Sequence, residues 1–348
     1  MERRNHSRNE FLDYLKGISI ILVFIGHCIQ YGSGGVFFYN AGFFENNLFK
    51  FIYSFHMPLF MLVSGYLFYY TVNRYSTKQV LVNRIKNVLI PIVAWGILSE
   101  CIVILKNIIG HDPIILYEVL YNFVRITLLN LWFLWAVLYC SLAVVFVRRF
   151  FNDSIWMYLL FFMASFILPD QLNMHLYKFM YPYFVSAYLL NKFNAITLTT
   201  KLKKWQILIC SGLIFFIMLS IYNKDTFIYN TGITLIGKNI PHQITINLFR
   251  WAIGYIGSIF VICLSKLSFD SITIANAKKL IVEAGMNSLG LYILNSFMNQ
   301  LLIRLTSKFT LNYMIIMAET VIMLILALFI NNIIKRIPIM NKILLGYR

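Results

Sequence analysis

The chain has 348 residues, of which 60% are hydrophobic and only 12% are charged, and its mean hydropathy is +0.73. A water-soluble domain of this length needs more charged residues on its surface, so the composition excludes that class and predicts a polytopic helical membrane protein. The apolar segments are continuous rather than alternating, which excludes a membrane β-barrel.

Ten apolar segments predict ten transmembrane helices. They cover residues 11–30, 48–70, 87–105, 127–147, 155–168, 177–190, 205–222, 244–264, 285–305 and 313–334. Segments 155–168 and 177–190 are each about 14 residues long, short of the roughly 20 that span a bilayer, so a re-entrant pair is the alternative for these two. The loops are short, and we expect a single all-α membrane domain over residues 1–348.

The basic residues orient this predicted domain. The formal net charge is +17, and of the 30 Lys and Arg residues 20 fall in one set of alternating loops, 6 in the other set and 4 inside apolar segments. Because basic loops stay on the cytoplasmic side, both termini are expected in the cytoplasm. Anionic lipid on that side explains the charge, so membrane lipid rather than nucleic acid is the expected partner. Arg84 and Lys86, at the inner edge of the third segment, belong to the basic set.

None of the five cysteines has the C-x-x-C spacing of a redox or zinc site. All five fall inside apolar segments or at their edges, where they serve as small apolar residues. We therefore expect neither a disulfide nor a metal site. No small-residue cleavage site follows the first apolar segment, which is expected to be a retained helix.

The first segment carries Asp13, Lys16 and His27 on one helix face, because at about 100° per residue all three fall within roughly 60°. Lys16 and His27 lie about 16 Å apart along the helix axis. One face thus has a cation near the cytoplasm and a proton acceptor near the outside. The alternatives are an ion pair between Lys16 and Asp13, and a hydrogen-bonded packing role for His27.

The second segment carries His56 two residues before Pro58, in its outer half. Proline lacks a backbone N–H and is expected to kink the helix. His56 and His27 are expected at similar depth in consecutive helices. His56 is therefore a candidate for the outer part of a cavity, with simple packing as the alternative.

Two carboxylates, Glu100 and Glu319, fall inside apolar segments. Ionisable side chains at such positions face the interior of the bundle or a cavity. An ion pair with Arg250 or Arg304 is expected for Glu319. The same pairing is one interpretation for Glu100, and a role near the outer histidines is the other.

The ninth segment has a polar stripe made of Ser288, Tyr292, Asn295 and Asn299. These residues follow one another at intervals of four, three and four, which places them on one helix face within about 60°. Hydrogen bonds between helices are one interpretation of the stripe. A cavity lined by water or substrate is the other.

Five stretches occur in order along the chain: FLDYLKGISIILVFIGH, FHMPLFMLVSGYLF, RIKNVLIP, LWFLW and NSLGLYIL. Together they resemble acyltransferase family 3 of the membrane O-acyltransferases. The resemblance implies a bacterial cytoplasmic-membrane enzyme that moves an acetyl group from acetyl-CoA to a hydroxyl of a cell-surface or lipid-linked glycan. Acetyl-CoA would be a co-substrate, and the resemblance implies no bound cofactor.

The resemblance also implies roles for single residues. His27 matches the histidine regarded as essential in the family, and an imidazole is a suitable general base at neutral pH. Arg84 matches a basic position associated with the acyl donor, and Lys16 and Lys86 would assist it. The candidates for the cavity and the acceptor are His56, Glu100, Ser288, Tyr292 and Asn295.

The chain departs from the family pattern at three positions. Lys16 replaces the usual arginine, which removes a bidentate fork. Asn87 stands where a second arginine often follows Arg84, and Asn295 stands where a histidine often occurs. Broken helices and polar stripes also suit a transporter or flippase of a lipid-linked saccharide, which is the alternative function. A glycan polymerase is a third interpretation, but the short loops disfavour it.

Overall fold

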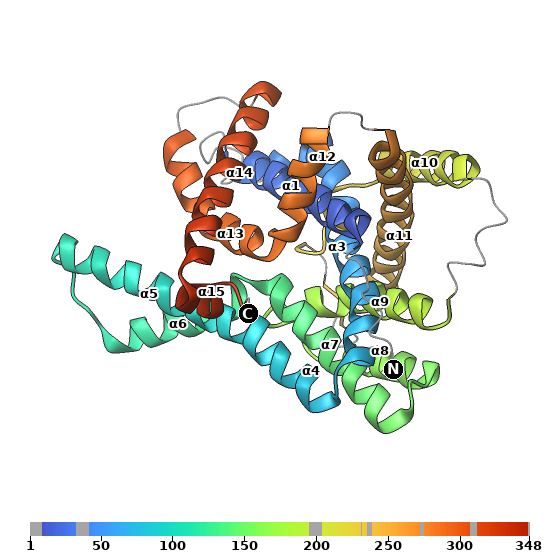
Figure 1. The fold of residues 1–348 in the computed structure, drawn as a ribbon, viewed down its shortest axis with the longest axis horizontal. Coiled ribbons are helices and arrows are strands. Elements are labelled where there is room, and N and C mark those ends of the chain that lie inside the picture. The colour runs from blue at the N-terminus through green and yellow to red at the C-terminus, as the bar shows by residue number, and fades with distance from the viewer. Residues whose placement is uncertain are drawn as a thin grey trace. The chain divides into compact units, whose positions relative to one another are not determined.

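The computed structural model describes residues 9–32, 42–194, 204–230, 232–234, 239–271, 275–306 and 312–346. No strand occurs in these ranges and helices dominate them, so the predicted all-helical fold is confirmed (Figure 1). The helical elements, in chain order, are α1 (Glu10–Tyr31), η2 (Gly42–Glu45), α3 (Asn47–Arg74), α4 (Thr77–Arg84), η3 (Ile85–Leu89), α5 (Ile90–Gly110), α6 (Leu116–Leu129), α7 (Trp132–Phe151), α8 (Ile155–Ser165), α9 (Met174–Lys192), α10 (Lys204–Ser220), η5 (Lys224–Thr226), α11 (Ile240–Ser271), α12 (Ala275–Met286), α13 (Ser288–Thr306), α14 (Tyr313–Arg336) and α15 (Pro338–Leu344).

Six helices in the described ranges are long and apolar enough to cross a membrane. They are α1, α3, the continuous stretch Thr77–Gly110, α7, α11 and α14. These six contain five of the predicted segments whole and most of segment 127–147. Helix α7 begins only at Trp132, because residues up to Leu129 belong to the separate helix α6.

The other four predicted segments are helical but fall outside these six. Helices α8 and α10 are apolar, but they are only 11 and 17 residues long. Helices α9 and α13 have 19 residues each and carry more polar side chains. The count of ten spans and the cytoplasmic position of both termini therefore stay predictions.

Local side-chain chemistry sets several helix ends. The Asn9 side chain accepts hydrogen bonds from the amides of Phe11 and Leu12 at 3.1 and 3.3 Å, which starts α1. A capping box starts α4, where the Ser76 hydroxyl accepts from the Gln79 amide and the Gln79 side chain accepts from the Ser76 amide. Helix α3 continues through Pro58 without ending there.

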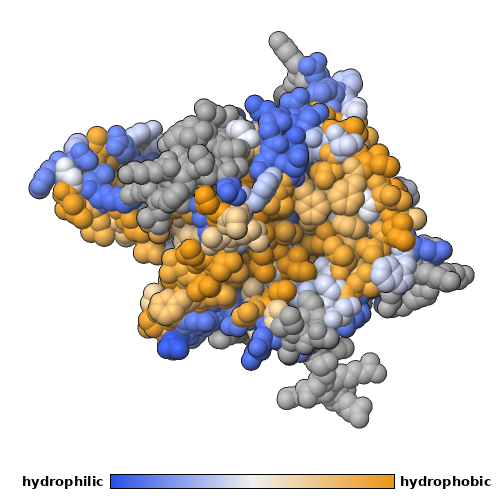
Figure 2. All heavy atoms as spheres, turned by 90° about the horizontal axis from the view of Figure 1, so that it is seen from above, coloured by the Kyte–Doolittle hydropathy of each residue, from blue (hydrophilic) through white to orange (hydrophobic). Residues whose placement is uncertain are grey.

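Hydrophobic residues also cover much of the exterior. In Figure 2 they form broad continuous areas of the face shown, and hydrophilic residues gather in separate patches. Exposed examples are Ile109 on α5, Ile217 on α10 and Ile325 on α14. Exposed apolar areas of this extent indicate contact with lipid, in agreement with a membrane protein.

The chain divides into two compact units. Unit 1 comprises Met1–Val63, Thr200–Tyr222 and Ile253–Leu328, and unit 2 comprises Ser64–Thr199, Asn223–Ala252 and Phe329–Arg348. Each unit is described by itself below. The expectation of a single domain over residues 1–348 stays a prediction.

Unit 1 is built around α1, which packs closely against α12 and α13. Two glycines allow this close approach. A methyl group on Gly17 would meet the backbone oxygen of Ile281, and one on Gly285 would meet the backbone oxygen of Asp13. Small residues at a helix crossing are the common way for membrane helices to pack tightly.

Unit 2 contains α7 packed against α9 and α5 packed against α6. The C-terminal helix α15 also lies against α5. The indole N–H of Trp95 on α5 donates to the backbone oxygen of Leu344 at 2.8 Å. Gly346 follows with a φ of +65°, and a side chain there would collide with the backbone of Asn87.

Candidate active site

His27 lies in the last two turns of α1, half-buried, with two amide side chains of α13 beside its ring. Nδ1 contacts Oδ1 of Asn295, and the Nδ2 of Asn299 lies 3.3 Å from the same ring nitrogen. An amide oxygen only accepts, so the contact with Asn295 places the imidazole proton on Nδ1. The other ring nitrogen, Nε2, then keeps its lone pair and can act as a base.

His56 on α3 lies in the same unit and is 4% exposed. Its Nδ1–H donates to the backbone oxygen of Ile52 at 2.8 Å, which also leaves Nε2 unprotonated. The two imidazoles lie close enough to act on each other electrostatically. Both histidines lie in unit 1, on helices that the contact between Tyr53 and Gln30 joins.

Aromatic side chains surround the two histidines. The Tyr31 ring meets the His27 ring edge to face at 5.6 Å between centroids. The Tyr53 ring lies 4.6 Å from that of His56, and its hydroxyl donates to Gln30 at 3.3 Å. These contacts connect α1 and α3 around the histidine pair and restrict the orientation of both rings.

Lys16 and Asp13 lie near the N-terminal end of α1. The Lys16 ammonium is 2.6 Å from Oδ1 of Asp13, so the predicted ion pair is confirmed. The Asp13 side chain is 6% exposed and that of Lys16 is 20% exposed. The charge of Lys16 is therefore largely neutralised by its neighbour on the same helix.

The polar stripe of α13 is brought to His27 only in part. Within the described residues, contacts to the imidazole come from Asn295 and Asn299. Ser288 is the first residue of α13, and Tyr292 is buried one turn further along. Interhelical hydrogen bonding, one of the two interpretations of the stripe, is thus observed for Asn295.

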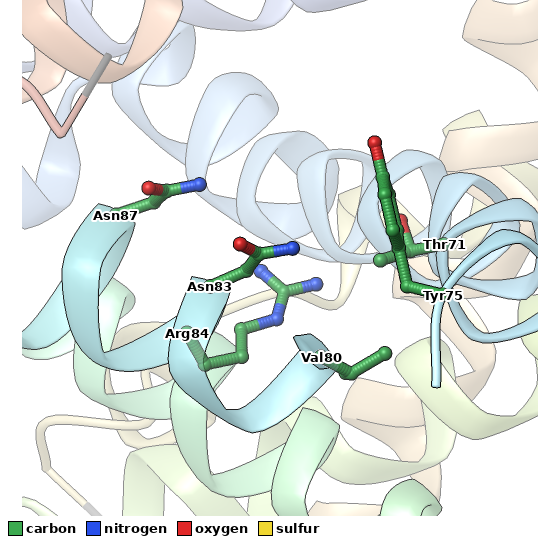
Figure 3. Close-up of a pocket in the computed structure, with 6 residues that line it drawn as sticks. All are labelled: Thr71, Tyr75, Val80, Asn83, Arg84 and Asn87. Carbon is green, nitrogen blue, oxygen red and sulfur yellow. The ribbon is translucent and has the colours of Figure 1, made fainter. Parts of the chain in front are cut away.

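Arg84 lines a pocket in unit 2, which we call the Arg84 pocket. Its volume is about 290 Å³, and its lining residues are Thr71, Tyr75, Val80, Asn83, Arg84 and Asn87. Figure 3 shows the side chains of Asn83 and Arg84 pointing toward Thr71 and Tyr75. The Arg84 guanidinium stacks over the Phe68 ring at 4.5 Å, and it has no ion pair with any described residue.

This pocket is chemically suited to an anion. The guanidinium offers a fixed positive fork, and the amides and hydroxyls of the other lining residues offer further donors. The wall at Asn87 belongs to the π-helical turn η3, which follows α4 directly. Lys86 is on the same turn but is exposed and does not line the pocket.

Glu100 is buried on α5, where it is 4% exposed. Both carboxylate oxygens lack a hydrogen-bond partner in the described chain, and so does the hydroxyl of Thr127 on α6, which lies against Gly96 one turn earlier on α5. Arg250 meanwhile donates within unit 2 to the backbone oxygens of Thr226 and Phe227. Arg250, one of the two partners considered for Glu100, is therefore not paired with it, because backbone oxygens already accept from that arginine. The side chain of Arg304 lies outside the described residues.

Residues 9–335 of the chain match the family model of acyltransferase 3, which is described as an acyltransferase domain. It belongs to the acyltransferase 3 family. Every candidate residue of this acyltransferase 3 chain lies inside the matched range.

Two relatives are nodulation proteins NolL. The one from Mesorhizobium japonicum (strain LMG 29417 / CECT 9101 / MAFF 303099) is 28% identical over 244 residues, which cover 69% of this chain and 63% of that protein. The one from Sinorhizobium fredii (strain NBRC 101917 / NGR234) is 31% identical over 229 residues, covering 65% of this chain and 60% of that protein. The match thus spans less than two thirds of either relative. No solved structure matches the chain.

Glu319 is a buried carboxylate of this acyltransferase 3 chain for which the sequence predicted an ion pair with Arg250 or Arg304. It lies on α14 in unit 1, buried, and neither carboxylate oxygen has a hydrogen-bond partner in the described chain. No ion pair is found for it among the described side chains, which do not include that of Arg304, so the predicted pairing with Arg304 stays a prediction. One carboxylate oxygen lies against Gly32, at the end of α1 that carries His27. The signal in the sequence was an acidic residue whose neighbours three and four positions away are all apolar.

Proposed function

We propose that the protein is a membrane O-acyltransferase that moves an acetyl or other short acyl group from its CoA thioester, acetyl-CoA in the first place, to a hydroxyl of a cell-surface or lipid-linked glycan. The observation that carries this proposal is the fixed orientation of His27, whose Nδ1 faces Asn295 and whose Nε2 is free to take a proton. Membership of the acyltransferase 3 family and the similarity to nodulation proteins NolL support it.

The transfer of an acyl group to a hydroxyl requires one proton acceptor. His27 Nε2 takes the proton of the glycan hydroxyl, and the hydroxyl oxygen forms a bond to the acyl carbon. The bond from that carbon to its leaving group breaks, and the leaving group receives the proton. The hydroxyl must lose its proton both in direct transfer from the thioester and in transfer through an acyl-protein intermediate, so the role of His27 is the same in either route.

Unit 2 supplies the proposed donor site. Arg84 faces a pocket of about 290 Å³ without a counterion among the described residues, and a phosphate of acyl-CoA has the complementary charge. Lys16 has a more limited role in this proposal, because it is paired with Asp13 and orients α1. The proposed location is the bacterial cytoplasmic membrane, with acyl-CoA entering from the cytoplasm.

The test is the O-acetyl content of purified surface glycan, measured by proton NMR. The strains compared are the parent, a deletion, and the deletion complemented at equal membrane levels with the wild type, His27→Ala or His242→Ala. His242 is an exposed histidine on α11 and serves as the matched control.

Acetyl signals that vanish on deletion and return with the wild type and His242→Ala, but not with His27→Ala, are the expected result. Unchanged acetylation in the deletion overturns the proposal. If the glycan then also fails to reach the surface, the alternative of a transporter or flippase takes its place.

A further inference from the structure

A second, smaller cavity adjoins the Arg84 pocket in unit 2. Its volume is about 20 Å³, and its lining residues are Val72, Tyr75, Thr77, Val80, Val145 and Arg148. Tyr75 and Val80 also line the Arg84 pocket, so these two side chains form the wall common to both spaces. One arginine from α4 and another from α7 thus face neighbouring cavities.

The side chain of Arg148 is held in place by polar contacts. Its Nη2 donates to Asn73 Oδ1 at 2.9 Å, and its Nη1 donates to the Tyr188 hydroxyl at 3.2 Å. These bonds use two of the five N–H donors of a guanidinium, which leaves the others for a ligand. Arg148 is therefore oriented before any ligand arrives.

The positive charge of Arg148 is only partly neutralised. Its nearest carboxylate, Asp153, is 3.7 Å away and lies closer to Lys192, at 3.3 Å. The same carboxylate accepts hydrogen bonds from the hydroxyls of Tyr158 and Tyr188, at 2.7 and 3.0 Å. One carboxylate thus serves two cations, which leaves a net positive charge beside the small cavity.

We propose that Arg148 binds the 3′-phosphate of acyl-CoA while Arg84 binds its diphosphate. This inference rests on the proposed acyl-CoA donor. A CoA thioester carries two separate anionic groups, and two cavities sharing a wall provide two separate cations. The 3′-phosphate is a terminal group, so one of its oxygens can enter the small cavity, whose volume of about 20 Å³ has room for one water-sized group. The diphosphate is an internal linker and needs the larger, more open pocket.

Arg149 provides the matched control, because it is the next residue on α7 and belongs to the same basic cluster at the helix end. It is exposed and lines neither cavity. If these arginines only orient the helix in the membrane, replacing either one has the same effect. A binding role makes Arg148 alone sensitive.

The experiment measures binding of CoA and of 3′-dephospho-CoA to the purified full chain in lipid nanodiscs, by isothermal titration calorimetry. The variants are Arg148→Ala, Arg148→Lys, Arg149→Ala and Arg84→Ala. We expect the wild type to bind CoA about 10- to 100-fold more tightly than dephospho-CoA, the usual range for hydrogen bonds to a charged group. Arg148→Ala should remove this preference and leave the affinity for dephospho-CoA unchanged.

The remaining variants test whether the loss of preference for CoA is specific to Arg148. Arg84→Ala should weaken both ligands alike, and Arg149→Ala should weaken neither. Arg148→Lys should recover part of the preference, since it restores the charge without the planar fork. Retained binding of dephospho-CoA by Arg148→Ala also shows that this variant is folded.

Three outcomes overturn the inference. The wild type shows no preference for CoA over dephospho-CoA, or Arg148→Ala keeps that preference. In the third outcome, Arg148→Ala and Arg148→Lys both lose affinity for the two ligands to the same extent. A wild type that binds neither ligand overturns the proposed acyl-CoA donor itself, and the inference with it.

Discussion

The contact between Asn295 and His27 gives a sharp prediction, because a second amide lies one turn away on the same helix. The Asn295 oxygen accepts the Nδ1 proton of His27, whereas Asn299 presents Nδ2 to the same ring nitrogen at 3.3 Å. A protonated Nδ1 cannot accept from that amide. Only Asn295 therefore holds the imidazole in the form that leaves Nε2 free, and only its loss should impair proton removal strongly.

The size of the effect follows from the hydrogen bond. Asn295→Ala leaves a buried ring N–H without its partner, at a cost of about 1–3 kcal/mol. Since about 1.4 kcal/mol corresponds to a tenfold change in rate, we expect kcat to fall roughly 5- to 150-fold. His27→Ala should lower it further, by about 10²- to 10⁴-fold. Asn299→Ala should change kcat less than about fivefold, and Asn295→Asp, which keeps an acceptor at this position, should retain more activity than Asn295→Ala.

The assay is the initial rate of transfer of radiolabelled acetyl from acetyl-CoA to native surface glycan in membrane vesicles with equal amounts of each variant. The reasoning is refuted if Asn295→Ala keeps more than half of the wild-type rate. It is equally refuted if Asn299→Ala impairs the reaction as much as Asn295→Ala does.

Three further predictions concern packing and buried charge. The added methyl group in Gly17→Ala would meet the backbone oxygen of Ile281, so this variant should lose about 1–3 kcal/mol of unfolding free energy. An unchanged denaturation midpoint in detergent would contradict the close contact between the two helices. Glu319→Gln should lower the transfer rate about tenfold, because a neutral amide accepts a hydrogen bond from the acceptor hydroxyl more weakly than a carboxylate does. Thermal stability should stay the same or rise, since the buried carboxylate has no partner in the described chain. A drop in stability with full activity would show a structural role. Asp153→Asn should destabilise the protein by about 3 kcal/mol, because the charges of Arg148 and Lys192 then lose the carboxylate that faces both of them. An equilibrium unfolding curve that matches the wild type would rule this out.

The helical architecture was predictable because lipid leaves few alternatives. Backbone groups in a bilayer must be satisfied within the segment, so long apolar runs become helices. The six apolar spans match predicted segments for this reason. Helix lengths were harder to predict, because ends depend on local turns that hydropathy does not report. Helix α7 ends at Phe151, and Asn152 and Asp153 follow with positive φ values.

The candidate site was predictable up to the choice of partners. Helical spacing placed Asp13 beside Lys16 and gathered Asn295 and Asn299 on one face, and both groupings are found. Spacing along one helix cannot tell which distant helix that face meets. His27 and Asn295 are 268 positions apart, so only the folded chain joins them.

The predicted ion pair of Glu319 also depends on a partner from a distant segment, and the side chain of one candidate, Arg304, lies outside the described residues. A buried carboxylate is normally paired, and the sequence offered arginines in other apolar segments as partners. In unit 1 the carboxylate instead lies against the end of α1 without a partner in the described chain. Ionisable side chains in such surroundings cluster at functional sites, which is why Glu319→Gln is tested for activity as well as for stability.

Asn87 departs from the family pattern, in which an arginine often occurs at this position, and the structure of unit 2 offers a physical reason for the difference. The residue lines the Arg84 pocket as a neutral amide, where a second arginine would place two like charges on adjacent turns of one helix. Under the proposal for acyl-CoA, the second cation comes from Arg148 on α7, across the wall formed by Tyr75 and Val80. Two cations on different helices can face two phosphates that are separated along the ligand, whereas two on adjacent turns of one helix face a single group. Arg148 then supplies the second positive charge of the donor site, although the distribution of basic residues among the loops alone explains this arginine by membrane orientation.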